Sequence, residues 1–169
     1  MRNNIVLTGF MGTGKTTVGK KVAEKLNMKF IDTDSVIERE EGMSISDIFS
    51  QKGEKEFRKI ESRIVKKVSQ NTNCVIATGG GVVLNKTNMD CLRKNGIIIY
   101  FESDVESIFR NVNGSRNRPL LQSDDLRIHI YNMLEKRKNY YMNHDYKINV
   151  GNLTVEEVVN KVIDIYKNL

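Results

Sequence analysis

A short segment near the N-terminus has the residue types and spacing needed to bind the phosphates of a nucleotide. The pattern G-x-x-x-x-G-K-[ST] is matched by Gly9-Phe10-Met11-Gly12-Thr13-Gly14-Lys15-Thr16, directly after a strand-like run. Glycines permit positive-φ turns that direct backbone N–H groups at phosphate oxygens, and a following helix adds partial positive charge. Lys15 would reach the β- and γ-phosphates, and the Thr16 hydroxyl would bind Mg²⁺. A chance glycine-rich turn is the alternative.

The loop alone leaves the fate of the γ-phosphate open, so an acceptor site has to be sought elsewhere. Two carboxylates follow the second strand-like run: Asp32 and Asp34 are two residues apart, and in an extended segment both point the same way. Both would then face the phosphate loop across the carboxyl ends of neighbouring strands. One would help to hold the Mg²⁺ ion and the other would orient an attacking hydroxyl. A helix N-cap is the alternative.

Charged residues also occur where the helical pattern predicts a core. Successive residues of a helix are rotated by ~100° about its axis, so residues three or four apart share a face. On this basis Glu61 lies inside one apolar face and Arg58 at its edge. Arg137 falls near the middle of a second apolar face. The first of these apolar arcs consists of Phe57, Ile60, Ile64, Val65 and Val68. The second arc consists of Leu126, Ile130, Met133, Leu134, Tyr140 and Tyr141. A buried guanidinium is costly unless it is paired or faces an anion, and planar Arg suits a carboxylate. We expect both arginines to bind an anionic ligand and Glu61 to orient Arg58, with a buried ion pair as the alternative.

A glycine triplet and a polar loop complete the candidate chemistry. Gly79, Gly80 and Gly81 follow Thr78 and would leave backbone N–H groups free for an oxygen-rich ligand, or form a plain flexible turn. This strand carries no acidic residue of the Walker B type, which assigns metal binding to Thr16 and Asp32. The stretch 111–125 is predicted to be a mobile lid.

The lid stretch contains the only proline of the chain, Pro119, directly after Arg118. Arg118 is predicted to neutralise charge on the transferring phosphoryl group while closure of the lid excludes water. Arg116 is expected to be a solvated surface arginine.

Composition limits the class of protein. The chain has 169 residues, of which 39% are hydrophobic and 28% charged, and this predicts one domain over residues 1–169. Its longest uncharged apolar run is far below the ~18 residues of a membrane-spanning helix, and no signal-peptide layout is present, so we expect a cytoplasmic protein without a membrane partner. The net charge of +6 favours small anions over nucleic acid, because like-charge blocks and interleaved aromatic residues are absent.

The elements that must position these residues alternate in type. Strand-like runs at 5–8, 29–31, 75–78, 97–101 and 146–150 are separated by helical stretches, which predicts an α/β fold with a parallel sheet and helices on both faces. Capping-box spacing marks helix starts at Ser103 and Thr154. Cys74 and Cys91 fit no metal spacing and are expected to be buried reduced thiols, with a disulfide as the alternative.

In their order and spacing, these residues resemble the shikimate kinase family over nearly the whole chain. The matching segments are Gly12 to Thr16, Phe30-Ile31-Asp32-Thr33-Asp34, Gly42-Met43-Ser44-Ile45 with Ile48-Phe49, Phe57-Arg58 with Glu61, Thr78 to Gly81, Arg118-Pro119-Leu120-Leu121, and Arg137 with Tyr140-Tyr141. The resemblance implies a P-loop NTPase fold of the nucleoside-monophosphate-kinase type, with a five-stranded parallel sheet. It also implies a shikimate-binding segment at about 33–61 and a mobile lid at about 111–125.

The resemblance assigns roles residue by residue. Shikimate would be bound by Asp34, Arg58, Gly79, Gly80, Gly81 and Arg137, with the two arginines on its carboxylate and Glu61 behind Arg58. ATP would be bound by Gly12, Thr13, Gly14, Lys15, Thr16, Thr17, Arg110 and Arg118, with Arg110 near the adenine. Thr16 and Asp32 would surround one Mg²⁺ ion, and Lys15, Asp34 and Arg118 would be catalytic. The match is loose around 149–152.

The implied reaction is transfer of the ATP γ-phosphoryl group to the 3-hydroxyl of shikimate, in aromatic amino-acid biosynthesis, by a monomer without a nucleic-acid partner. One alternative is a related kinase acting on gluconate, which would need differently placed anion-binding groups. Another is a nucleotide-dependent switch protein, which would leave Arg58, Arg137 and Asp34 without a purpose. His129 and His144 are expected to be structural.

Overall fold

Five parallel strands form the centre of the molecule. The computed structural model describes residues 3–112 and 126–169. The strands are β1 (Asn4–Gly9), β2 (Lys29–Asp32), β3 (Cys74–Ala77), β4 (Gly96–Glu102) and β5 (Tyr146–Asn149), each within one residue of the predicted bounds. The helices are α1 (Lys15–Leu26), α2 (Thr33–Glu41), α3 (Ile45–Val68), α4 (Lys86–Asn95), α5 (Val105–Val112), α6 (Leu126–Tyr141) and α7 (Val155–Lys167), with a short 3₁₀ turn, η1 (Val82–Leu84).

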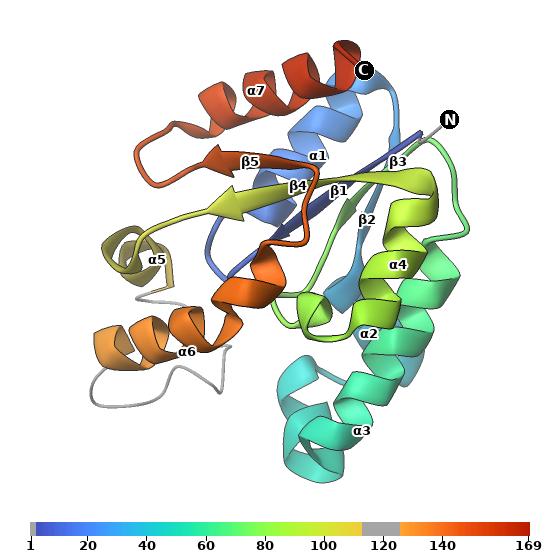
Figure 1. The fold of residues 1–169 in the computed structure, drawn as a ribbon. Coiled ribbons are helices and arrows are strands. Elements are labelled where there is room, and N and C mark those ends of the chain that lie inside the picture. Colours follow the sequence, from blue (N-terminus) through green and yellow to red (C-terminus); the bar gives the residue numbers. More distant parts are fainter. Residues whose placement is uncertain (1–2, 113–125) are drawn as a thin grey trace.

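The strand order is β2-β3-β1-β4-β5, and every neighbouring pair is parallel. Helices cover both faces of this sheet, as predicted (Figure 1). Successive side chains of a strand point to opposite faces, so Val6 belongs to one hydrophobic core while Ile5 and Leu7 belong to the other. Because the strands are parallel, β1, β2 and β3 all end at one edge of the sheet, with Leu7 and Asp32 both in register with Ala77.

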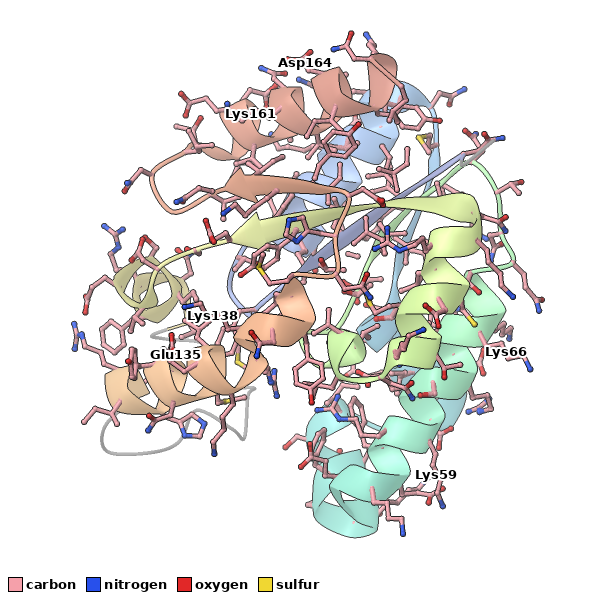
Figure 2. All side chains as sticks on the ribbon, viewed as in Figure 1. Lys59, Lys66, Glu135, Lys138, Lys161 and Asp164 are labelled. Carbon is pink, nitrogen blue, oxygen red and sulfur yellow. The ribbon has the colours of Figure 1, made fainter. Side chains whose placement is uncertain are left out.

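One face of the sheet is covered by α1 and α7, which lie side by side in Figure 1. Val158, Val159 and Val162 are buried there, while Lys161 and Asp164 of α7 project outward in Figure 2. The capping box at Thr154 is confirmed, because Thr154 Oγ1 accepts from Glu157 N while Glu157 accepts from Thr154 N. α7 therefore begins where the sequence pattern predicts.

The capping box expected at Ser103 is wrong. Asp104 takes that place, since its Oδ1 accepts the Ser107 N–H at 2.8 Å, one residue later than Ser103 could. A carboxylate is at least as good an N-cap as a hydroxyl, and two candidate caps stood side by side in the sequence.

The other face of the sheet is covered by helices α2 to α6. Among them, α3 is bent. Gly53 has φ 77° and ψ 168° inside α3, a conformation that glycine adopts without a steric penalty. After the bend, Phe57, Ile64 and Val65 are buried as the apolar arc predicts. In α6 the predicted burial is confirmed for Tyr141, which is 2% exposed, and is wrong for Tyr140, which is 47% exposed.

Both cysteines are free thiols. The predicted burial is confirmed for Cys74 and is wrong for Cys91, which is partly exposed. Among residues 3–112 and 126–169, no helix combines the length and apolar character needed to cross a membrane.

Candidate active site

The phosphate loop connects β1 to α1 at the carboxyl edge of the sheet. Gly12 and Gly14 have φ of 78° and 83°, and Gly14 precedes the first residue of α1. A Cβ on Gly12 would lie 2.6 Å from Val112 Cγ1, so this glycine is required by space as well as by conformation. In the described part of the chain no side chain caps α1, which leaves its first backbone N–H groups to an anion.

Lys15 folds back over the loop that it follows. Its Nζ donates to the carbonyl oxygens of Gly9 and Phe10, both at 2.8 Å, and its side chain is buried. A buried ammonium group held against carbonyl oxygens attracts an anion more strongly than a solvated one does. The position of Lys15 therefore suits contact with phosphate oxygens.

Thr16 and Asp32 lie together beside the loop. Thr16 Oγ1 donates to Asp32 Oδ2 at 2.7 Å, while Asp32 Oδ1 accepts from the backbone N–H groups of Asp34 and Ser35. The helix N-cap and the metal-site arrangement were alternatives in the sequence, and one carboxylate has the geometry for both. Two hard oxygen donors suit Mg²⁺, with phosphate oxygens and water completing its shell. Among the described residues no group of three metal-ligating side chains exists.

Asp34 reaches the site by a different geometry from the one predicted. It lies in the first turn of α2 and not in an extended segment. Even so, Asp34 lines the same pocket as Lys15, and its Oδ1 lies 2.6 Å from where a Cβ on Gly79 would stand. The carboxylate is therefore packed against the glycine triplet. The extended-segment argument was wrong because the Asp32 cap starts a helix immediately after β2.

Arg58 and Arg137 both line this pocket, which has a volume of about 650 Å³. Arg58 Nη1 donates to both carboxylate oxygens of Glu61, at 3.1 and 2.9 Å, as their spacing of three residues predicts. Arg137 is 9% exposed, and its Cζ lies 5.8 Å from the centre of the Phe10 ring. In the chain as described, no carboxylate lies within ion-pairing distance of Arg137. Its charge therefore lines the pocket without a direct ion pair, although the Glu61 carboxylate interacts with it electrostatically.

The glycine triplet is held between these groups. Gly79 N donates to Thr33 Oγ1 at 2.9 Å, so the expectation of a free N–H is wrong at Gly79. Gly80 packs against the phosphate loop, because a Cβ there would lie 3.3 Å from Met11 N. Gly81 packs against Arg58. The triplet lets two guanidinium groups and the phosphate loop approach one another closely.

The close approach at Gly81 gives a testable prediction. A Cβ on Gly81 would lie 2.2 Å from Arg58 Nη1, and the end of a flexible side chain can move away. Gly81→Ala should therefore leave the protein folded but displace Arg58, which would raise KM for an acid bound there about tenfold. Steady-state kinetics test this. An unchanged KM for the acid, or an equal rise for the nucleotide, would contradict it.

Glu61 is buried, with 1% exposure, and burial raises its pKa above the ordinary 4.5, although Arg58 and Arg137 oppose this. The folded state thus binds the proton more tightly than the unfolded state. The resulting stabilisation is full below pH 4.5 and is lost as pH rises through the raised pKa.

We therefore expect the unfolding free energy of the protein, relative to the non-titrating variant Glu61→Gln, to fall as pH rises above 4.5. Urea denaturation at several pH values measures this difference. The same measurement on Glu56→Gln, a partly exposed position of α3 whose carboxylate accepts a hydrogen bond from Lys59, corrects for the loss of one surface negative charge. A difference that grows with pH would show that Glu61 stabilises the fold mainly as an anion.

Most of the predicted site residues lie in this one pocket. It is lined by Gly12, Gly14, Lys15, Thr16, Thr17, Asp32, Asp34, Arg58, Glu61, Gly79, Gly80, Gly81 and Arg137. Thr13 does not line it: its side chain is buried and donates to Phe10 O. Arg110 also lies outside the lining and donates to Ser107 Oγ at 3.0 Å. The predicted lid of about 111–125 is wrong at its first two residues, because Asn111 and Val112 belong to α5. The rest of it, with Arg118, lies outside the described residues.

Several lining residues were not predicted as site residues: Met11, Glu38, Ile45, Phe49, Phe57, Thr78, Asn111 and Val155. Asn111 Nδ2 donates to Gly12 O at 2.8 Å, which ties the end of α5 to the phosphate loop. Nothing in the sequence pattern signals a contact between residues so far apart. Ile45, Phe49, Phe57 and Thr78 did occur in the segments that carry the family resemblance.

The shikimate kinase family model matches residues 11–167. The shikimate kinase of Caldanaerobacter subterraneus subsp. tengcongensis is 52% identical over 166 residues, covering 98% of this chain and 97% of the relative. Among solved structures, a shikimate kinase from Acinetobacter baumannii in complex with shikimate has a TM-score of 0.94 at 33% identity, over 98% of this chain and 93% of that one.

A gluconokinase from Sinorhizobium meliloti has a TM-score of 0.59 at 15% identity, over 99% of this chain and 95% of that one, and shares the fold alone. The family predicted from the residues is confirmed: the chain belongs to the shikimate kinase family, whose members phosphorylate shikimate with ATP in the pathway to the aromatic amino acids.

Proposed function

We propose that this chain transfers the γ-phosphoryl group of ATP to the 3-hydroxyl of shikimate with the pocket residues in specific roles. The observation that carries the proposal is that Lys15, Asp34, Arg58 and Arg137 line one pocket. One cation lies on the phosphate loop, and two guanidinium groups and the carboxylate of Asp34 line the same pocket. A small hydroxylated acid fits this combination.

The nucleotide would bind with its phosphates over the loop. Backbone N–H groups from Gly12 to Thr17 would hold the phosphate oxygens at the start of α1, and Lys15 would reach the β- and γ-phosphates. Arg118 would neutralise charge on the transferring group from the lid, about 111–125, and Arg110 would lie near the adenine. Val155, which lines the pocket but is 39% exposed, would border the same nucleotide.

We assign one Mg²⁺ ion to Thr16 and Asp32, whose oxygens are 2.7 Å apart. When bound, the ion would neutralise charge on the β- and γ-phosphate oxygens. Thr16 would contribute its hydroxyl directly. Asp32 would act beside it while its second oxygen keeps α2 capped.

Shikimate would occupy the part of the pocket formed by the segment of about 33–61, the glycine triplet and α6. Its carboxylate would bind Arg58 and Arg137, with Glu61 holding Arg58 in place. Asp34 would accept a hydrogen bond from the 3-hydroxyl and aim its oxygen at the γ-phosphorus. The bond from that oxygen to phosphorus forms, the bond to the β-phosphate oxygen breaks, and the hydroxyl proton leaves toward Asp34.

Positioning contributes most of the rate enhancement in this scheme, because phosphoryl transfer needs little covalent chemistry from the protein. We further propose that the chain acts in the cytoplasm as a monomer with one kinase domain over residues 1–169.

The test is ADP formation from MgATP with no acceptor, with shikimate and with a panel of sugar acids that includes gluconate. The proposal predicts ADP formation that depends on shikimate, with shikimate 3-phosphate as the product. Equal turnover with gluconate would favour the sugar-acid kinase alternative. Nucleotide hydrolysis independent of every acceptor would favour the switch protein.

A further inference from the structure

The carbonyl oxygen of Gly80 receives hydrogen bonds from two residues of α6. Arg137 Nη1 donates to it at 3.4 Å, and Tyr141 Oη donates at 2.7 Å. Arg137 lines the pocket, whereas Tyr141 does not. The shorter and therefore stronger bond comes from the residue outside the pocket.

The Tyr141 hydroxyl is fixed in place by its surroundings. Its ring stacks on the Tyr100 ring, with centroids 5.1 Å apart and planes 10° apart, and the residue is 2% exposed. Burial raises the pKa of Tyr141 to about 12, so the hydroxyl keeps its proton at neutral pH. Tyr141 is thus a permanent hydrogen-bond donor to Gly80.

Gly80 lies close to both the phosphate loop and Arg137, so a displacement of its backbone would affect both. A Cβ on it would stand 3.3 Å from Met11 N of the phosphate loop and 3.8 Å from Arg137 Nη1. Arg137 cannot give the same N–H to Gly80 and to a carboxylate at once. The Gly80 carbonyl is partly buried. If it lost its only donor when Arg137 turned to an anion, free energy would be lost, and the Tyr141 bond offsets that cost.

We propose that Tyr141 is a positioning residue for acceptor binding: it satisfies the Gly80 carbonyl and so leaves the Arg137 guanidinium available to the carboxylate of the acid. This inference rests on the proposed binding of shikimate by Arg137. Tyr141 itself touches neither substrate, and it acts through Gly80 and Arg137.

The experiment measures steady-state kinetics of Tyr141→Phe, which keeps the stacked ring and removes only the hydroxyl. We expect KM for shikimate to rise about three- to tenfold, while kcat and KM for ATP change less than about twofold. Tyr140→Phe, which removes an exposed hydroxyl from the neighbouring position, is the matched control and should leave all three parameters unchanged. A loss of folded protein would lower kcat without raising KM, so KM separates positioning from stability.

A double-mutant cycle tests the route through Arg137. In an Arg137→Ala background, adding Tyr141→Phe should change kcat/KM for shikimate, normalised to the folded fraction, by less than about twofold. A full effect of Tyr141→Phe in that background, or an unchanged KM in the single variant, would overturn the inference. If Arg137→Ala itself leaves KM for shikimate unchanged, the result contradicts the proposed binding of shikimate by Arg137, on which this inference rests.

Discussion

Lys15→Ala should reduce turnover by at least about 10²- to 10³-fold, the loss expected when a positioned charge that stabilises the transition state is removed. Lys15 is buried over the phosphate loop and donates to Gly9 O and Phe10 O. Alanine can replace neither its charge on the phosphoryl oxygens nor its contacts with the loop. The measurement is kcat from ADP release at saturating MgATP and shikimate.

The fold must be checked in the same experiment, because Lys15 also holds the loop. Circular dichroism and the thermal midpoint of the variant establish that it is folded. Lys20→Ala, which removes an exposed lysine from the same helix, is the matched control and should keep full turnover. Kinase activity retained by folded Lys15→Ala would refute the role of the phosphate loop.

Arg137→Ala should raise KM for shikimate about 10- to 100-fold, the loss expected for a charge-assisted hydrogen bond to a carboxylate. Arg137 is 9% exposed, and among residues 3–112 and 126–169 no carboxylate lies within ion-pairing distance of it. Its charge is therefore available to a ligand. KM for ATP should change far less, because the nucleotide binds at the phosphate loop.

Lys138→Ala is the matched control, since it removes the adjacent cation. Lys138 is exposed on α6 and is labelled in Figure 2. It should leave both KM values unchanged. Equal losses for ATP and shikimate in Arg137→Ala would mean that Arg137 supports the fold of the pocket and does not select the acid.

The parts of the fold predictable from sequence are those controlled by local patterns. Strand bounds follow from short runs rich in Ile, Val, Phe and Tyr, and each lies within one residue of its predicted position. The Arg58–Glu61 pair follows from a spacing of three residues on a helix. Both depend only on neighbours along the chain, which is why the sequence pattern is sufficient.

Errors arose where two local signals compete. Asp34 was expected in an extended segment, but Asp32 caps α2 and turns the chain into a helix. Tyr140 and Tyr141 are adjacent, and an arc drawn at ~100° per residue does not decide which of them is buried. Packing against Tyr100 buries Tyr141.

Contacts between distant segments were not predictable from the pattern. The Asn111 bond to Gly12 O joins residues 99 positions apart, and the bond from Gly79 N to Thr33 depends on β2 and β3 being neighbours. Val155 reaches the pocket only because α7 packs beside α1. Such contacts depend on the order of the strands, and alternating strands and helices do not encode that order.

A crystal structure with ADP, Mg²⁺ and shikimate would test the arrangement most directly. We expect the acid in the pocket beside Lys15, its carboxylate contacting the guanidinium groups of Arg58 and Arg137, and its 3-hydroxyl within hydrogen-bonding distance of Asp34. Shikimate bound with its carboxylate away from both arginines, or with a different hydroxyl against Asp34, would contradict the proposed site.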